Sequence, residues 1–476
     1  QPMLLANPAE HPLMMGLLIR KEVLTHLLSY RFILTFSLFF VLVVSSVQMI
    51  ALNYSRQVEN HAETRRAQEE QLRESGDFRR MRWSGIQAEK APNPLSIFAT
   101  GLEREMSRSI RISNSRDVKL GRNKYANPLF VLFSTPDLLY IVNIVGSLLA
   151  LLFAFDAICG EKEEGTLQLM MANSVPRHTI LLAKWIGGYA VLVLPFLTAI
   201  LIAVLFAQLT TSLSFTGAEW TAFSMMLAVA ALYLSVFFAL GMMISALTHS
   251  ANISLVFNFL IWVVLVLVIP NTAPIVARAV SPVPSAGVMA SKREAVQRQV
   301  WGEMRQNRRN QRDMSREERR QQRDEIRARI EEETGKILTA YMRKVDDQIS
   351  MSILLARISP SSNFVYATAN IAGSGLDNFA SMRNVIDRYR VDFMEWWQAE
   401  SHARRQRAES VESQEERQAL RDAPVDLDDL PQFTVGRAGL DEILVSAQTD
   451  LLLLLLLNMA FFMGAYMSFL RYDLME

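Results

Sequence analysis

The stretch GEKEEGTLQLMMANSVPRHTILLAK, residues 160–184, gathers the residue types best suited to binding another protein. It opens with the charged cluster 161–164, whose carboxylates can form ion pairs with arginine or lysine of a partner. Gly165 then interrupts the chain, Thr166 can cap a helix, and residues 167–171 predict a short amphipathic helix. The stretch therefore indicates a docking loop for a partner, with a plain connection between two membrane spans as the alternative.

Residues that could catalyse a reaction lack the neighbours that catalysis needs. The sequence contains no GxxxxGK[ST] phosphate-binding loop and no GxSxG elbow. No two of the six histidines are near neighbours, so helical zinc pairs are absent, and Cys159 has no credible histidine partner. The carboxylates lie amid similar numbers of arginines, which favours ion pairs over an acid–base pair. We expect no enzymatic activity, no metal and no cofactor in this chain.

Charge and hydropathy place the chain among membrane proteins. Its 476 residues carry 49 Lys+Arg against 48 Asp+Glu, a net charge of +1, and no basic motif for nucleic acid occurs. Half of the residues are hydrophobic, and many are segregated into long runs almost without charge. The single cysteine excludes a disulfide within the chain.

Six apolar runs approach or exceed the roughly 20 helical residues that cross a bilayer core of about 30 Å. They predict an all-α polytopic membrane protein whose six transmembrane helices lie at 32–52, 138–159, 186–209, 221–247, 253–269 and 451–470. Pro270 follows the fifth run, so that helix is expected to end or bend there. Within residues 1–31, Leu13–Tyr30 predicts an amphipathic helix on the inner membrane surface, with the solvated start of the first span as the alternative.

The short connections predict the orientation, because cytoplasmic loops carry an excess of lysine and arginine. The loop 160–185 and the tail 471–476, which lie on the side of the termini, contain basic residues, whereas the connection 210–220 contains none. Both termini are therefore expected in the cytoplasm. Segments 53–137 and 270–450 would then face outward.

Both outward segments are expected to be mainly helical. Lys292–Ile358 is almost free of Gly and Pro, and Ser315 with Glu318 forms an S-x-x-E capping box, so two helices are expected to meet just before it. A loop is expected at 359–376, followed by a helical stretch at 376–421. The charges favour solvated faces laced with ion pairs, with a surface for anionic lipid headgroups or a protein partner as the alternative.

Polar residues inside the apolar runs are costly in lipid and therefore call for an explanation. Hydrogen bonds between helices are one explanation, and the lining of a substrate path is the other. The candidates for a translocation path are Asn143, Asn258 and Asn458. Asp156 lies near one end of the second run and is expected to reach the membrane interface.

The stretch after the second run resembles the coupling region of ABC-2 type permeases, whose usual form is E-[RK]-E-x-G-T-L followed by a proline-containing turn. Ile19-Arg20-Lys21-Glu22 also resembles that family's N-terminal helix, and the two long segments resemble a subgroup with insertions after spans one and five. The residues that would couple to an ATPase by this resemblance are Glu161, Lys162, Glu163, Glu164, Gly165, Thr166, Leu167, Pro176 and Arg177.

The resemblance implies a permease subunit of the bacterial inner membrane. It would pair with a second permease protomer, identical or paralogous, and bind two copies of a cytoplasmic ABC ATPase that holds ATP and Mg. Two functions follow: export of a substrate between the protomers, or mechanotransmission, in which the outward segments act on an envelope partner. A scaffold or sensor without an ATPase is a third reading, which the E-K-E-E-G-T-L match disfavours.

Overall fold

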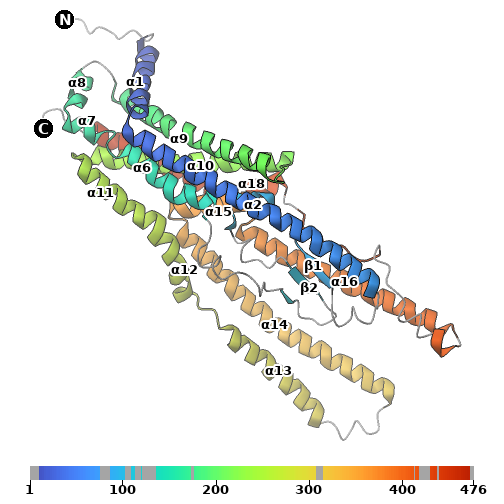
Figure 1. Cartoon of the computed structure of the whole chain (residues 1–476). Coiled ribbons are helices and arrows are strands. Elements are labelled where there is room, and N and C mark those ends of the chain that lie inside the picture. The colour runs from blue at the N-terminus through green and yellow to red at the C-terminus, as the bar shows by residue number, and fades with distance from the viewer. Residues whose placement is uncertain are drawn as a thin grey trace. The chain divides into compact units, whose positions relative to one another are not determined.

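The computed structural model describes residues 10–75, 86–101, 109–112, 119–120, 136–172, 176–306, 315–411, 413–416, 429–436 and 439–471. Two compact units make up the chain, and they are described separately below. Unit 1 comprises Gln1–Trp262 with Asn363–Glu476, and unit 2 comprises Val263–Ser362. Figure 1 shows a mainly helical protein.

Among the described residues, six helical segments are long and apolar enough to cross a membrane, which confirms the predicted all-α polytopic fold. They are Tyr30–Gln68, Leu138–Glu163, Arg177–Thr210, Gly217–Leu247, Ala251–Val280 and Leu440–Leu470. Each is longer than the apolar run that predicted it, because helical structure also includes polar residues beside the run. The predicted tail after Arg471 lies outside the described residues.

A separate helix precedes the first span. This helix, α1, covers Glu10–Leu27, and α2 follows at Tyr30–Ser75. At 1.5 Å per residue, the 46 residues of α2 extend for about 70 Å, more than twice the thickness of a bilayer core. The first span therefore continues as one helix well beyond its predicted end at residue 52.

The second span is assembled from short pieces. It contains α5 (Leu138–Ile141), the π-helical turn η3 (Val142–Gly146) and α6 (Ser147–Ala154). Two short helices follow, α7 (Cys159–Glu163) and α8 (Thr166–Ala172).

The fifth span does not end at Pro270. It runs from α11 (Ala251–Trp262) through the π-helical turn η4 (Val263–Val268) into α12 (Ile269–Val280). A proline removes one backbone donor and collides with the preceding turn of an α-helix. The wider π-helical turn lies directly before Pro270 and changes the hydrogen-bond pattern there, so that the helix continues.

The core of unit 1 is built around α10 (Gly217–Leu247), which begins with a Thr216–Glu219 capping box. It packs against α6 and α18 (Leu440–Leu470), and it also contacts α9 (Arg177–Thr210). A Cβ atom at Gly241 would lie only 2.6 Å from the Ala154 Cβ. Small residues thus let α10 and α6 approach closely, as is common between membrane helices.

Segment 53–137 adds a small sheet that the sequence did not predict. The strands β1 (Ile86–Glu89), β2 (Ser109–Ile112) and β3 (Lys119–Leu120) pair antiparallel in the order β1-β2-β3. Ile86 pairs with Ile112, and Ile110 pairs with Leu120. The short helix η1 (Pro94–Ile97) also lies in this segment.

Unit 2 contains a helical hairpin of α13 (Ala286–Gln306) and α14 (Arg316–Ala356). Ser315 and Glu318 form the predicted capping box at the start of α14, which confirms that prediction. Arg329 binds Glu303 across the hairpin at 3.0 Å. Residues 307–314, where the two helices were expected to meet, lie outside the described part of the chain.

The expected loop at 359–376 is wrong for most of its length, because Pro360–Ala372 form the helix α15. Pro360 occupies the first helical position, where a missing N–H costs nothing. Gly373, at φ +75°, ends the helix. The next helix, α16, covers Leu376–Glu409. The residues 363–372 of α15 are mostly buried in unit 1.

We predict that Gly241→Val destabilises the protein by about 1–3 kcal/mol, because the added side chain collides with Ala154. Gly217→Val is the matched control on the same helix, since nothing lies within 4 Å of a Cβ atom there. Thermal unfolding in detergent can be followed with a thiol-reactive dye, because the single cysteine, Cys159, is buried. Equal melting temperatures for the two variants would contradict the close packing.

Candidate functional site

The predicted docking loop forms two short helices separated by a sharp turn. α7 is followed by Gly165 at φ +70°, a conformation that favours glycine, and then by α8. The short helix predicted at 167–171 is thus confirmed. We call the end of unit 1 that carries α1, α7 and α8 the α1 end, and the end that carries η1 the η1 end.

A buried lysine joins three elements at the α1 end. The Lys184 Nζ atom of α9 lies 2.9 Å from Glu22 Oε1 of α1 and 2.9 Å from Glu161 Oε1 of α7. Only 4% of the Lys184 side chain is exposed. We call Lys184, Glu22 and Glu161 the Lys184 cluster. An ammonium group can be buried at tolerable cost only when carboxylates replace its water, so the three helices depend on one another.

Two further basic groups border the Lys184 cluster. Lys21 Nζ lies 3.3 Å from Glu161 Oε1, but about half of the Lys21 side chain is exposed. His26 Nε2 lies 3.9 Å from Glu22 Oε2. Burial lowers the pKa of His26, and this effect outweighs the carboxylates of Glu22 and Asp156, which raise it.

A second set of contacts fixes α7 to the connection between α10 and α11. The Ser245 hydroxyl oxygen accepts hydrogen bonds from the backbone N–H groups of residues 158 and 159, each at 3.0 Å. Lys162 Nζ donates to the carbonyl oxygens of Ala246 at 2.6 Å and Thr248 at 3.0 Å. Glu163 accepts from the Ala251 N–H at 3.2 Å. These bonds satisfy backbone groups that the helix ends leave unpaired.

Arg177 and Arg31 each bind another element at the same end. Arg177 donates to the carbonyl oxygens of Phe469 at 3.3 Å and Leu470 at 2.6 Å, where α18 ends. Arg31 binds Asp156 at 2.6 Å and lies over the Phe155 ring, 5.3 Å from its centroid. Asp156 is therefore paired with a charge of opposite sign, and the loop is joined to the first, third, fourth, fifth and sixth spans.

Four of the predicted coupling residues bind groups of their own chain, whereas the exposed surface of the loop combines Glu164 with two neighbouring residues that were not predicted. Glu161, Lys162, Glu163 and Arg177 all bind groups of their own chain. Leu167 is fully buried. By contrast Glu164 and Gln168 are exposed, and so is 70% of Leu169. Sequence reasoning missed Leu169, although its position two residues after Leu167 places it on the opposite face of α8.

The three candidate path residues contact different partners. Tyr233 of α10 donates its hydroxyl hydrogen to Asn143 Oδ1 at 2.8 Å, and Asn458 Nδ2 donates to the Ser235 hydroxyl at 2.6 Å. Asn258 donates to the Ser254 carbonyl within its own helix at 3.0 Å, and its buried Oδ1 makes no hydrogen bond among the described residues. Their role in a translocation path stays a prediction.

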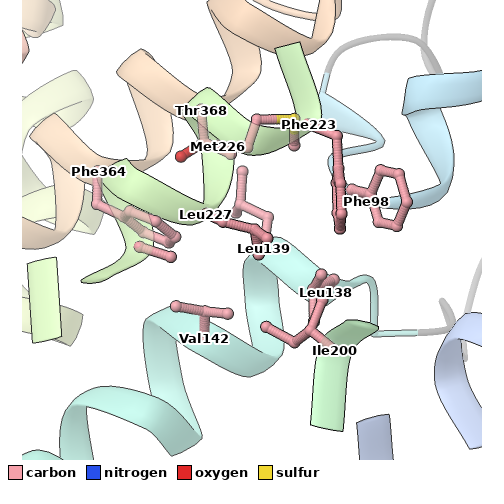
Figure 2. A pocket seen from close by; sticks show the side chains of 11 residues that line it. Phe98, Leu138, Leu139, Val142, Ile200, Phe223, Met226, Leu227, Phe364 and Thr368 are labelled. Atoms are coloured by element: carbon pink, nitrogen blue, oxygen red, sulfur yellow. The ribbon is translucent and has the colours of Figure 1, made fainter. Parts of the chain in front are cut away.

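An apolar cavity lies toward the η1 end, and none of the three asparagines lines it. Its walls include Phe98, Phe223, Phe364 and Thr368 (Figure 2). Its volume of about 20 Å³ is on the scale of one water molecule. This space is too small to hold a transported molecule. Among the described residues, no three His, Cys, Asp or Glu side chains gather as a metal site.

A family model described as ABC-2 family transporter protein matches residues 17–474. The chain belongs to this family. The match covers both the Lys184 cluster and the loop of α7 and α8, as well as all six spans. No curated protein matches the chain. As a member of the ABC-2 family, the protein is a transmembrane subunit of an ABC transporter, and such subunits work with an ABC ATPase subunit.

We predict that Lys184→Met destabilises the protein by about 3–5 kcal/mol, because it removes the buried cation that the largely buried carboxylates of Glu22 and Glu161 share. Lys21→Met is the matched control, and it should cost about 1 kcal/mol or less because that pair is exposed. Denaturant unfolding in detergent measures both. A similar decrease in the free energy of unfolding for the two variants would show that the buried Lys184 cluster stabilises the protein no more than an exposed ion pair does.

We also predict that the protein loses stability as the pH falls from about 7.5 to about 5.5, in part through His26. Because burial lowers the pKa of His26, the unfolded chain takes up a proton near pH 6.5 that the folded chain resists. The unfolded state therefore gains relative stability on acidification. The measurement is the melting temperature at both pH values, and His26→Gln should show the smaller decrease. An equal decrease in the variant would exclude His26 as the cause.

Proposed function

We propose that the protein is the permease subunit of an ABC exporter of the bacterial inner membrane. The α1 end would face the cytoplasm, and a separate ATPase, present in two copies with ATP and Mg, would bind there. A second permease protomer would complete the membrane part, surrounded by membrane lipids. The observation that carries this proposal is the Lys184 cluster, which joins α1, α7 and α9 beneath the exposed face of α7 and α8.

The engaged residues give the docking loop a fixed shape. Lys162, Glu163 and Arg177 bind the ends of three other helices, so force applied to the loop reaches several spans together. The exposed Glu164, Gln168 and Leu169 then form the docking face. An apolar side chain ringed by polar groups is a common arrangement in protein interfaces.

Mechanotransmission is the second candidate, and a specific observation favours it. The Phe364 ring of α15 stacks on Tyr233 of α10 with 4.4 Å between ring centroids. A part of the long segment 270–450 is thus packed against the central helix of the spans. In this alternative, ATP hydrolysis would move segments 53–137 and 270–450 against an envelope partner, and little would cross the membrane.

We predict that Leu169→Asp and Glu164→Arg each weaken ATPase binding by about tenfold or more, which corresponds to about 1.4 kcal/mol of lost contact. The measurement is the affinity of the purified permease for the ATPase encoded beside it, together with the rate of ATP hydrolysis by the complex. Glu325→Arg on the exposed surface of α14 is the matched control. Unchanged binding in both loop variants would place the ATPase elsewhere.

Electron cryo-microscopy of the complex, with and without a non-hydrolysable ATP analogue, separates the two functions. A cavity between protomers that opens or closes with nucleotide supports export, and Asn143, Asn258 or Asn458 should then line it. A sealed bundle with moving segments 53–137 and 270–450 supports mechanotransmission. An ATPase that fails to bind at all would overturn both.

A further inference from the structure

The helix α15 reaches deep into the bundle of spans. Phe364, Ala367, Ile371 and Ala372 are all buried. The Phe364 ring lies almost parallel to that of Tyr233, with an angle of 16° between the ring planes. Figure 2 shows Phe364 and Thr368 on α15 facing the same cavity as the span residues.

The position of Tyr233 fixes the depth that α15 reaches. Tyr233 lies close to the midpoint of α10, Gly217–Leu247, and therefore about 20 Å from either end of that helix. Because a bilayer core is about 30 Å thick, the stacked rings lie near the middle of the span. The chain on either side of α15 belongs to the long segment between the fifth and sixth spans.

Tyr233 connects α15 to a second span. Its hydroxyl group donates to Asn143, whose side-chain and backbone oxygen atoms lie 2.8 and 2.9 Å away. Asn143 belongs to the π-helical turn η3, where the second span departs from regular α-helix. A change in either span would therefore alter the surface on which Phe364 rests.

The other end of α15 is fixed at the η1 end. Asn93 donates to the Ala372 carbonyl at 2.7 Å, and the Ser374 hydroxyl donates to the Ala99 carbonyl at 2.8 Å. The backbone is tightly packed here: a Cβ atom at Gly375 would lie 1.8 Å from Asn370 Oδ1. α16 begins directly after Gly375, so this tight packing restricts its movement relative to α15.

We propose that α15 is a rigid link that carries movement of the second and fourth spans to α16. The proposal rests on the proposed function to the extent that ATP drives the movement. A close-packed interior does not absorb a displacement by compression, so a shift at Tyr233 must move Phe364 or leave a void. The tight junction at Ala372–Gly375 then passes that shift to α16.

The test measures distances in the full chain with its ATPase, with and without a non-hydrolysable ATP analogue. Cys159→Ser removes the native cysteine. One pair of spin labels at Leu209 of α9 and Gln398, both exposed, reports on α16 relative to the third span, which lies outside the proposed link. A second pair at Gly16 and Leu247 reports on the α1 end. Nucleotide should shift both distances in the otherwise unchanged chain.

Phe364→Ala should abolish the shift of α16 while the shift at the α1 end and ATP hydrolysis persist. Phe237→Ala is the matched control, because Phe237 also contacts Tyr233, at 5.1 Å between centroids, but belongs to α10 itself. It deletes an equal volume beside the same ring and should leave the shift of α16 in place.

Four outcomes would overturn the proposal. A normal α16 shift in Phe364→Ala excludes α15 as the link. An equal loss in both variants assigns the effect to a damaged core. If nucleotide changes the distance at the α1 end of the unchanged chain but not the distance to α16, the proposal of a link is wrong while the proposed function stands. If neither pair responds, both fail.

Discussion

The burial of one positive charge organises the α1 end of the protein. An ammonium group removed from water is stable only if carboxylates surround it, and Lys184 obtains them from α1 and α7. Neither carboxylate comes from the helix that carries the lysine. The stability of buried Lys184 therefore depends on the correct position of three separate elements. Displacement of any one of them would leave a buried charge without its partner.

Backbone groups at helix ends impose a related constraint. Helix ends near or within lipid leave N–H and C=O groups that water does not reach, and side chains of neighbouring elements must bind them. Lys162 does so for the end of α10, Ser245 for the start of α7 and Arg177 for the end of α18. The loop of α7 and α8 is thereby connected to most of the spans. Its shape follows from these bonds, and Glu164, Gln168 and Leu169 remain exposed on its surface.

Packing at the η1 end follows a different principle. Toward this end aromatic rings and small residues provide the contacts: Phe364 stacks on Tyr233 near the middle of α10, while Gly101 allows its backbone to lie against the backbone of Ser374. Aromatic stacking depends on close apolar contact, whereas the Lys184 cluster depends on opposite charges. The two ends of unit 1 are thus held by different forces, a paired buried charge at the α1 end and close packing toward the η1 end.

The sequence by itself determined the six spans, the short helix after the second span and the family, because long apolar runs and a compact local motif need no knowledge of distant neighbours. It also located the capping box at Ser315, since that signal is complete within four residues.

Only the tertiary structure decided which coupling residues are exposed. Glu161 and Glu164 are equivalent in the sequence, yet the first is bound by Lys184 and the second is exposed. The tertiary structure also decided that α15 is a helix. Its sequence resembles a loop because it starts with a proline and is followed by a glycine. The role of its apolar residue Phe364 becomes clear only from the contact with Tyr233, more than a hundred residues earlier. Such contacts depend on which elements meet in space, and that information is not local in the chain.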